Sequence, residues 1–242
     1  MPLSELDLIL LVLASGFTSF VTASVGIGGG VMLLAVMASI LPVSALIPVH
    51  GLVQLGSNGN RAVMTRFHIH WPMVLRFSLG ALLGALLASQ VLVQLPLDTI
   101  RIAVASFILF MVWGPKPQER NVSGLGTTIA GAITTFASMF VGASGPLVAS
   151  VIHRSGQEKL ATTATFASCM SFQHLLKALI FGFIGFSFAD WWLAILLMIT
   201  AGTVGTWLGL KLLNRLPAHI FAILFKTVVT VLALRLLWQV VV

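Results

Sequence analysis

The sequence has few charged residues, few acids and a single cysteine. Only 8% of its 242 residues are charged, against roughly 25% in soluble domains, and 58% are hydrophobic. The mean hydropathy is +1.07. This composition excludes a soluble domain and predicts an integral membrane protein. Because the apolar segments are long and do not alternate in short stretches, we expect an all-α polytopic membrane protein and not a β-barrel.

Several kinds of chemical site are missing. Cys169 is the only cysteine, which excludes an intramolecular disulfide and a Cys-x-x-Cys motif. No Gly-Lys-Ser/Thr follows the glycine-rich segments, which excludes a nucleotide P-loop. The apolar segments hold no Ser/His/Asp or paired-carboxylate arrangement, so we predict no catalytic residue and no enzyme. His68 and His70 lack a third ligand, and we interpret them as solvated. We therefore predict no metal site and no cofactor.

A glycine-rich interruption occurs twice in the chain. Val25–Val31 (VGIGGGV) breaks a long apolar run, and Val141–Leu147 (VGASGPL) follows 116 residues later. Further matches, such as Gly84 with Gly205, occur at an offset of 121 residues. We predict two transmembrane repeats, residues 1–114 and 124–242, joined by a polar cytoplasmic linker at 115–123.

Each repeat is expected to contain about five helical segments. We expect helices at about 6–24, 29–41, 43–66, 72–95 and 97–113, then at about 124–141, a short one ending near 153, and at 159–181, 189–210 and 217–240. The helix at 29–41 covers roughly 18 Å of a roughly 30 Å hydrocarbon core, so it cannot span alone. Pro42 is expected to end it.

The cations indicate how the repeats are oriented. The net charge of +7 records loop orientation and not nucleic-acid binding, because Lys and Arg collect in short cytoplasmic loops. Cations surround the connection near residue 66, but none lies at the equivalent connection, 182–188. At the following connection of each half the distribution of cations is reversed: the first half has none there, and the second half has them. We therefore expect inverted repeats, which are typical of secondary transporters, with both termini in the periplasm.

The two glycine breaks predict a binding site. Non-helical backbone inside the membrane must be buried in protein or line a wet cavity. We expect the breaks to meet near the midplane, where the N-termini of the short helices offer free N–H groups and partial positive charge to an anion. The alternative is that the glycines serve only close helix packing. The candidate residues are Gly28, Gly29, Gly30, Ser144 and Gly145.

A polar stripe follows the first break, on the helix expected at 43–66. Its residues, at helical spacing, are His50, Gln54, Ser57, Asn58 and Arg61. The positions 116 residues later hold Phe166, Met170, Gln173, His174 and Lys177, so the stripe is only partly kept. Polar side chains at this depth seldom face lipid. We therefore add Gln173, His174 and Lys177 to the candidate substrate-binding residues.

Three of the titratable candidates, Arg61, Lys177 and His50, have two interpretations each. Arg61 and Lys177 either attract an anion from opposite sides or lie near helix ends and extend to lipid headgroups. His50 either carries a coupling proton or is a hydrogen-bonded packing residue. Lys226 lies near the centre of the last expected helix, where a lysine usually faces a cavity.

These features resemble the sulfite exporter TauE/SafE family of membrane permeases. The resemblance rests on Gly26–Gly30, Gly142–Pro146, the polar linker and the Arg66–Trp71 segment, and it extends over nearly the whole chain. It implies an inner-membrane permease for a small sulfur-containing anion such as sulfite, thiosulfate or an organosulfonate, working by alternating access. Ser144 stands where a glycine is common in the family, and its hydroxyl could donate to the substrate.

Other functions remain open at this point. One is a proton-coupled carboxylate or metal-ion permease, which His50, His68 and His70 would suit. Another is a membrane assembly protein without a substrate. The lack of Asp and Glu inside the apolar segments argues against a cation path, and the embedded glycine breaks argue against a purely structural role. The expected partners are a small anionic substrate and the lipid bilayer, with no nucleic acid; a homo-oligomer is left open.

Overall fold

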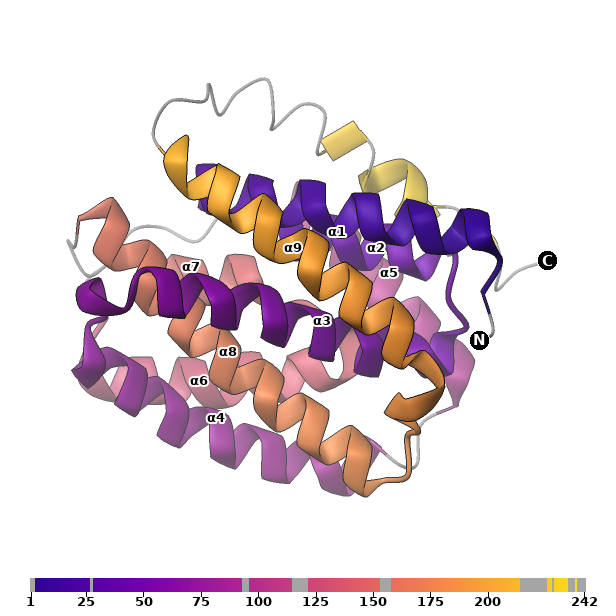
Figure 1. Ribbon diagram of the computed structural model, residues 1–242. Coiled ribbons are helices and arrows are strands. Elements are labelled where there is room, and N and C mark those ends of the chain that lie inside the picture. The colour runs from indigo at the N-terminus through magenta and orange to yellow at the C-terminus, as the bar shows by residue number, and fades with distance from the viewer. Residues whose placement is uncertain are drawn as a thin grey trace.

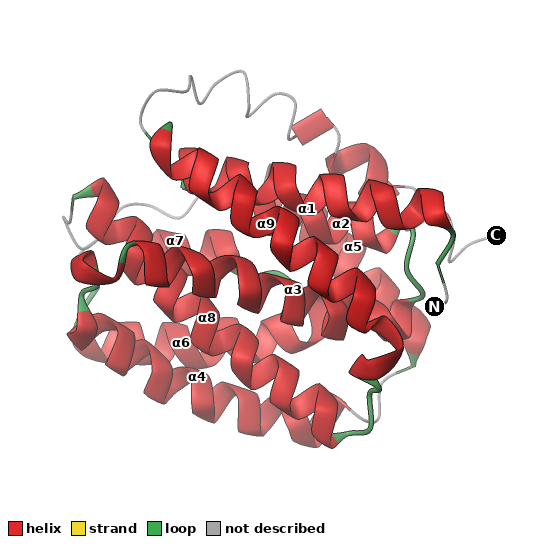
Figure 2. Ribbon diagram, in the orientation of Figure 1, coloured by secondary structure: helices red, strands yellow, loops and turns green. Residues whose placement is uncertain are grey.

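The fold is all-helical. The computed structural model describes residues 3–26, 28–92, 96–114, 122–152, 158–213, 226–227, 229–234 and 238, and no strand occurs among them. Figure 2 shows helices joined by short loops. The predicted all-α fold is therefore confirmed. Residues 115–121 of the predicted linker and most of the helix expected at 217–240 lie outside the described residues.

The helices follow the predicted order. They are α1 (Glu5–Val25), α2 (Gly29–Ala38), α3 (Val43–Met64), η1 (Arg66–His68), α4 (Trp71–Leu92), α5 (Leu97–Trp113), α6 (Gly124–Val141), α7 (Gly145–Ile152), α8 (Lys159–Phe183), η3 (Phe188–Trp191) and α9 (Trp192–Lys211). In the described part of the chain, α1, α4, α6, α8 and η3 with α9 are long and apolar enough to cross a membrane. This supports an integral membrane protein.

The second helix is shorter than expected. α2 ends at Ala38, and the backbone N–H groups of Ile40 and Leu41 both donate to the carbonyl of Met37 in a closing turn. Pro42 therefore does not end α2 but stands before α3 as its N-cap residue. Proline restricts only the residue directly before it, Leu41, which lies three residues beyond the end of α2. Ten residues cover about 15 Å, too little to span a bilayer.

Three long helix pairs build the molecule (Figure 1). α1 packs along α9, α4 along α6 and α3 along α8, so each pair joins segments from opposite halves of the sequence. Glycines permit this close packing. A Cβ added at Gly84 would overlap the carbonyl oxygen of Ala132 on α6, and one at Gly205 the carbonyl oxygen of Gly16 on α1. Only glycine fits at such backbone contacts.

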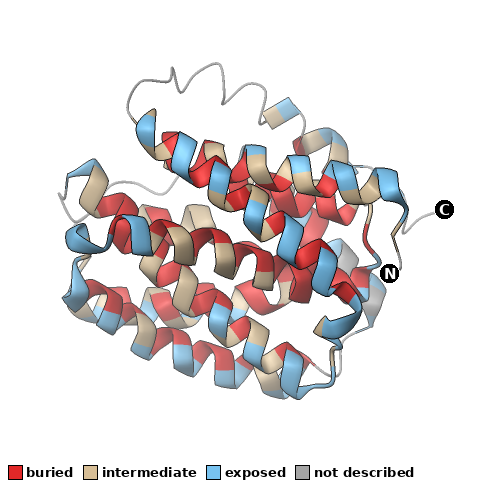
Figure 3. Ribbon diagram, in the orientation of Figure 1, coloured by how far each residue is buried: buried red, intermediate tan, exposed pale blue. Residues whose placement is uncertain are grey.

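Apolar side chains cover the outside, and the interior contains buried polar side chains as well as an apolar core. Leu79 is 63% exposed, Ile133 62% and Trp207 50%. By contrast Ser15, Thr18 and many other hydroxyl-bearing residues are buried. The outward faces of the long helices are exposed and their inward faces buried (Figure 3). This distribution suits a lipid-facing exterior around an interior in which hydroxyl-bearing side chains lie among apolar ones.

Candidate functional site

Both predicted breaks are present, and each depends on a glycine with positive φ. α1 ends at Gly26, with φ +101°, whose N–H donates to the carbonyl of Thr22 (2.9 Å). α6 ends at Gly142, with φ +85°, whose N–H donates to the carbonyl of Ser138 (3.0 Å). Gly28, the N-cap of α2, also has a positive φ, +102°. L side chains rarely adopt this conformation, so the breaks are encoded by these residues.

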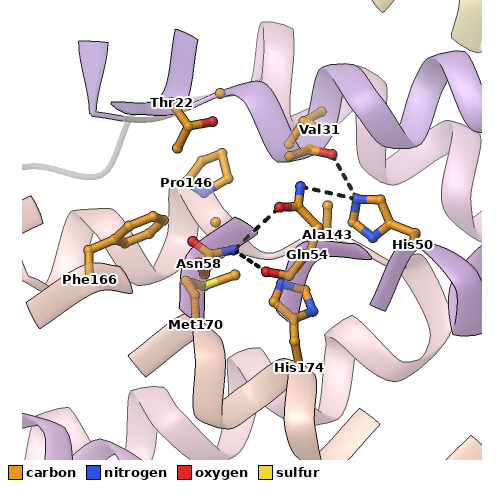
Figure 4. Close-up of a pocket in the computed structure, with 13 residues that line it drawn as sticks. Thr22, Val31, His50, Gln54, Asn58, Ala143, Pro146, Phe166, Met170 and His174 are labelled. Carbon is orange, nitrogen blue, oxygen red and sulfur yellow. Dashed lines mark hydrogen bonds between the residues drawn. The ribbon is translucent and has the colours of Figure 1, made fainter. Parts of the chain in front are cut away.

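A small cavity lies where the two short helices begin (Figure 4). Its volume of about 20 Å³ leaves room for roughly one water molecule. It is lined by Thr22, Gly28, Gly30, Val31, His50, Gln54, Asn58, Ala143, Gly145, Pro146, Phe166, Met170 and His174. The lining comes from both halves of the chain.

Equivalent positions of the two halves face this cavity. The pairs that differ by 116 residues are Gly30 and Pro146, His50 and Phe166, Gln54 and Met170, and Asn58 and His174. The first half supplies imidazole and amide groups. At the equivalent positions the second half supplies a phenyl ring, a thioether and one imidazole. The cavity therefore has a polar side on α3 and a largely apolar side on α8.

The polar side is a chain of hydrogen bonds along α3. Nε2 of His50 lies 2.9 Å from the carbonyl oxygen of Gly30, and a carbonyl only accepts, so Nε2 carries the proton. The amide nitrogen of Gln54 approaches the same Nε2 at 3.5 Å and finds no strong acceptor there. Nδ2 of Asn58 donates to the backbone carbonyl of Gln54 (2.9 Å) and to its Oε1 (3.3 Å). This arrangement leaves the Gln54 N–H groups available to a ligand.

Arg61 continues the chain. One guanidinium nitrogen, Nη1, donates to Oδ1 of Asn58 (3.1 Å), while Nε is buried without a partner among the described residues. The Arg61 side chain is only 1% exposed. The alternative that Arg61 extends to lipid headgroups is therefore wrong, because its side chain points into the protein.

On α8 the polar residues support the second break. Nζ of Lys177 donates to the carbonyl oxygen of Gly142 (2.5 Å), the residue that ends α6. Nε2 of Gln173 donates to the hydroxyl of Ser144. Lys177 is 0% exposed, so the headgroup alternative is wrong for it as well. Its stem crosses to α3, since a Cβ added at Gly51 would lie 2.7 Å from Lys177 Cδ.

No carboxylate in the described part of the chain lies beside these two buried cations. The described acids are Glu5, Asp7, Asp98, Glu158 and Asp190, all of them exposed or half-exposed at the starts of helices. Arg61 therefore carries a positive charge into the protein interior with no carboxylate partner among the described residues, and an ammonium at Lys177 has no such partner either.

The candidates from the sequence divide into two groups. Gly28, Gly30, His50, Gln54, Asn58, Gly145 and His174 line the cavity, whereas Gly29, Ser57, Arg61, Ser144, Gln173 and Lys177 do not. Gly29 faces α1, where an added Cβ would lie 2.8 Å from the carbonyl carbon of Thr18. This contact supports close packing at Gly29 and leaves open whether its N–H group contacts a substrate. Ser57 shares a hydrogen bond with Ser19 of α1 (2.9 Å).

Several lining residues were missed. They are Thr22, Val31, Ala143, Pro146, Phe166 and Met170. Phe166 and Met170 had a signal, since the 116-residue offset places them opposite His50 and Gln54. This signal is weak, because an apolar side chain on an apolar helix does not by itself mark a site.

The remaining titratable candidates lie elsewhere. His68 and His70 are exposed, and Nδ1 of His70 accepts from the N–H of Met73 (3.3 Å) at the start of α4. The described residues contain no group of three or more His, Cys, Asp or Glu able to hold a metal ion. Lys226 does not line the cavity; its ammonium lies 5.1 Å from the ring centroid of Trp113.

A helical membrane protein with a small cavity between two broken helices is typical of membrane permeases. More specifically, residues 11–236 match the family described as Sulfite exporter TauE/SafE, and the chain belongs to this family. The family is one of transporters, which points away from an enzyme. Searches of curated proteins and of solved structures found no match.

Proposed function

We propose that this permease moves a small sulfur-containing anion, such as sulfite, thiosulfate or an organosulfonate, across the bacterial inner membrane. One observation carries the choice of an anion: Arg61 and Lys177 are buried near the cavity, and no described carboxylate is their partner. Burying an ion without compensation costs several kcal/mol. A bound anion supplies the missing negative charge.

The backbone around the cavity supports the same choice. The first hydrogen bond of α2 runs from the N–H of Met32 to the carbonyl of Gly28, so the earlier N–H groups of this helix have no partner within it. They carry the partial positive charge of the helix N-terminus, which favours an anion. α7 offers fewer donors, because Pro146 has no N–H. The polar side of the cavity is thus the side of α2 and α3.

The apolar side narrows the substrate class. Phe166, Met170 and Pro146 offer no hydrogen bonds to an oxygen atom. Sulfate presents oxygen in every direction and would leave some of its oxygens without a partner on this side. A sulfonate carbon or the outer sulfur of thiosulfate suits a phenyl and thioether surface better. This favours an anion with two unlike ends.

Alternating access between two inverted repeats is part of the proposal. In the two repeats, α1 is equivalent to α6 and α4 is equivalent to α9. The α1–α9 pair is therefore equivalent to the α6–α4 pair, and both pairs occur. The contacts of Gly84 with Ala132 and of Gly205 with Gly16 correspond under the offsets of 121 and 116 residues. The cavity, with room for roughly one water, must also widen to admit an oxyanion. These points support a two-state carrier.

The test is anion binding by the purified protein, followed by uptake into proteoliposomes. Sulfite, thiosulfate, sulfoacetate, sulfate and acetate are compared for the wild type, Arg61→Gln and the control Arg66→Gln, whose side chain is exposed. We expect Arg61→Gln to weaken binding at least tenfold, since losing a buried charge partner costs about 2 kcal/mol or more. Arg66→Gln should bind like the wild type. Equal affinity of wild type and Arg61→Gln, or a preference for acetate, contradicts the proposal.

A further inference from the structure

The two buried cations occupy equivalent positions but differ in chemistry. Arg61 and Lys177 are 116 residues apart and both are buried. A guanidinium stays protonated in proteins, whereas a buried lysine amine readily changes between neutral and charged forms. One repeat therefore holds a permanent charge, and the other holds a charge that depends on its surroundings.

The hydrogen bonds of Lys177 suit both forms. A neutral amine and an ammonium can each donate to the carbonyl of Gly142, so the second break keeps this contact in either form. The ammonium has three N–H groups, and Gly142 is its only acceptor among the described residues. The ammonium form thus has donors left over, and its charge lacks a carboxylate partner.

The site lies close to the cavity and to two imidazoles. Gly142 precedes Ala143, a lining residue, and His174 lies one turn before Lys177 and also lines the cavity. The rings of His50 and His174 meet edge to face with centroids 6.0 Å apart. Nδ1 of each is buried without a partner among the described residues. An imidazole can accept and donate a proton, so both rings are suited to proton exchange at the cavity.

The other charged groups around α8 do not neutralise a positive charge on Lys177. The helices packed most closely against α8 are α3, α4, α7 and η1. Their titratable or charged side chains are His50, Arg61, Arg66, His68, His70 just before α4, and Arg76. None is an acid, so these described elements offer Lys177 no negative charge, and an anion in the cavity would supply one.

Together with the proposed anion transport, on which this step rests, we infer that Lys177 takes up one proton when the anion binds, so that anion and proton cross together. The amine gains the proton from water on the side where the anion enters, and forms the ammonium. On the opposite side the anion leaves, and the proton returns to water. The proton thus balances one of the two negative charges of an anion such as thiosulfate, and transport responds to a pH gradient.

The experiment measures protons taken up per anion bound by the purified full-length protein. Thiosulfate and sulfoacetate are titrated calorimetrically in two buffers of different ionisation enthalpy, near neutral pH where the thiosulfate and the sulfonate group stay ionised. We expect close to one proton per anion in the wild type. In Lys177→Arg, whose charge is fixed, binding should persist with close to zero protons taken up. In Lys177→Met both the affinity and the uptake should fall.

The outcomes separate this inference from the proposed function. Anion binding without proton uptake in the wild type overturns the inference and leaves the anion permease standing. Unchanged uptake in Lys177→Arg assigns the proton to another group and also overturns it. If Lys177→Arg does not fold, the wild type and Lys177→Met decide: uptake retained in Lys177→Met contradicts the assignment. No binding of any tested anion removes both proposals.

Discussion

Gly29 and Gly30 are neighbours in the first turn of α2, yet they face different surroundings. A Cβ at Gly29 would lie 2.8 Å from the backbone carbonyl carbon of Thr18 and closer still to its oxygen. A Cβ at Gly30 would lie 2.7 Å from Nε2 of Gln54, the end of a flexible side chain. The substitutions Gly29→Ala and Gly30→Ala therefore add the same methyl group to two different faces of one helix.

The two variants should fail in different ways. In Gly29→Ala the backbone of α1 must move, and overpacking of this kind costs about 1–3 kcal/mol. In Gly30→Ala only the Gln54 amide must move, while alanine in a helix gains about 0.5–1 kcal/mol over glycine. Stability should then be close to that of the wild type. The methyl group and the displaced amide fill the cavity of about 20 Å³, so anion binding should fall at least tenfold.

Two measurements on the same purified samples in detergent test these two variants: the thermal unfolding temperature and the affinity for the anion. Gly29→Ala should unfold at a clearly lower temperature, and the protein that remains folded should bind the anion. Gly30→Ala should unfold near the wild-type temperature and bind poorly. Wild-type affinity in Gly30→Ala would refute the placement of the site at the start of α2. Wild-type stability in Gly29→Ala would refute the contact with Thr18.

Two further predictions concern the repeats. Gly84→Ala and Gly205→Ala should each lower the unfolding temperature, and by similar amounts, because both add a methyl group at a backbone contact between equivalent helices; a loss in only one variant argues against equivalent packing. In a Cys169→Ser background, single cysteines at the two termini should react with a membrane-impermeant thiol reagent from the periplasm, and one at Glu119 only from the cytoplasm. A terminus that reacts on the same side as Glu119 contradicts the inverted arrangement.

The sequence predicted the fold class and the breaks because both depend on local signals. Long apolar runs determine the helices, and Gly26 and Gly142 have the positive φ that interrupts them. The sequence could not assign Gly29, because helical spacing says which residues share a face and not which helix lies against that face. The same reason applies to Ser57, whose position in the polar stripe suggested a ligand contact but whose hydroxyl meets Ser19 of α1.

The burial of Arg61 and Lys177 could not be predicted from the sequence and is seen only in the three-dimensional fold. From the sequence alone each residue could lie near the end of an apolar helix, and a long side chain there usually reaches the membrane surface. Packing of α3 against α8 closes that route, because it turns the polar stripe of α3 toward the equivalent face of α8. Charges buried in this way are screened little by salt, so an effect of either residue on anion affinity should persist at high ionic strength.

The partial loss of the polar stripe in the second half is informative about the substrate. A cavity between two identical halves would offer the same donors on both sides and would suit an anion with the same atoms at both ends. Here His50 and Gln54 face Phe166 and Met170 across one cavity, and a permanent cation on α3 is matched by an ionisable amine on α8. Both halves keep the backbone breaks and the glycine contacts, because each half needs them for the same geometry. The side chains that line the cavity differ. This distribution is expected if the repeats preserve the movement while the unlike side chains orient an asymmetric anion and its proton.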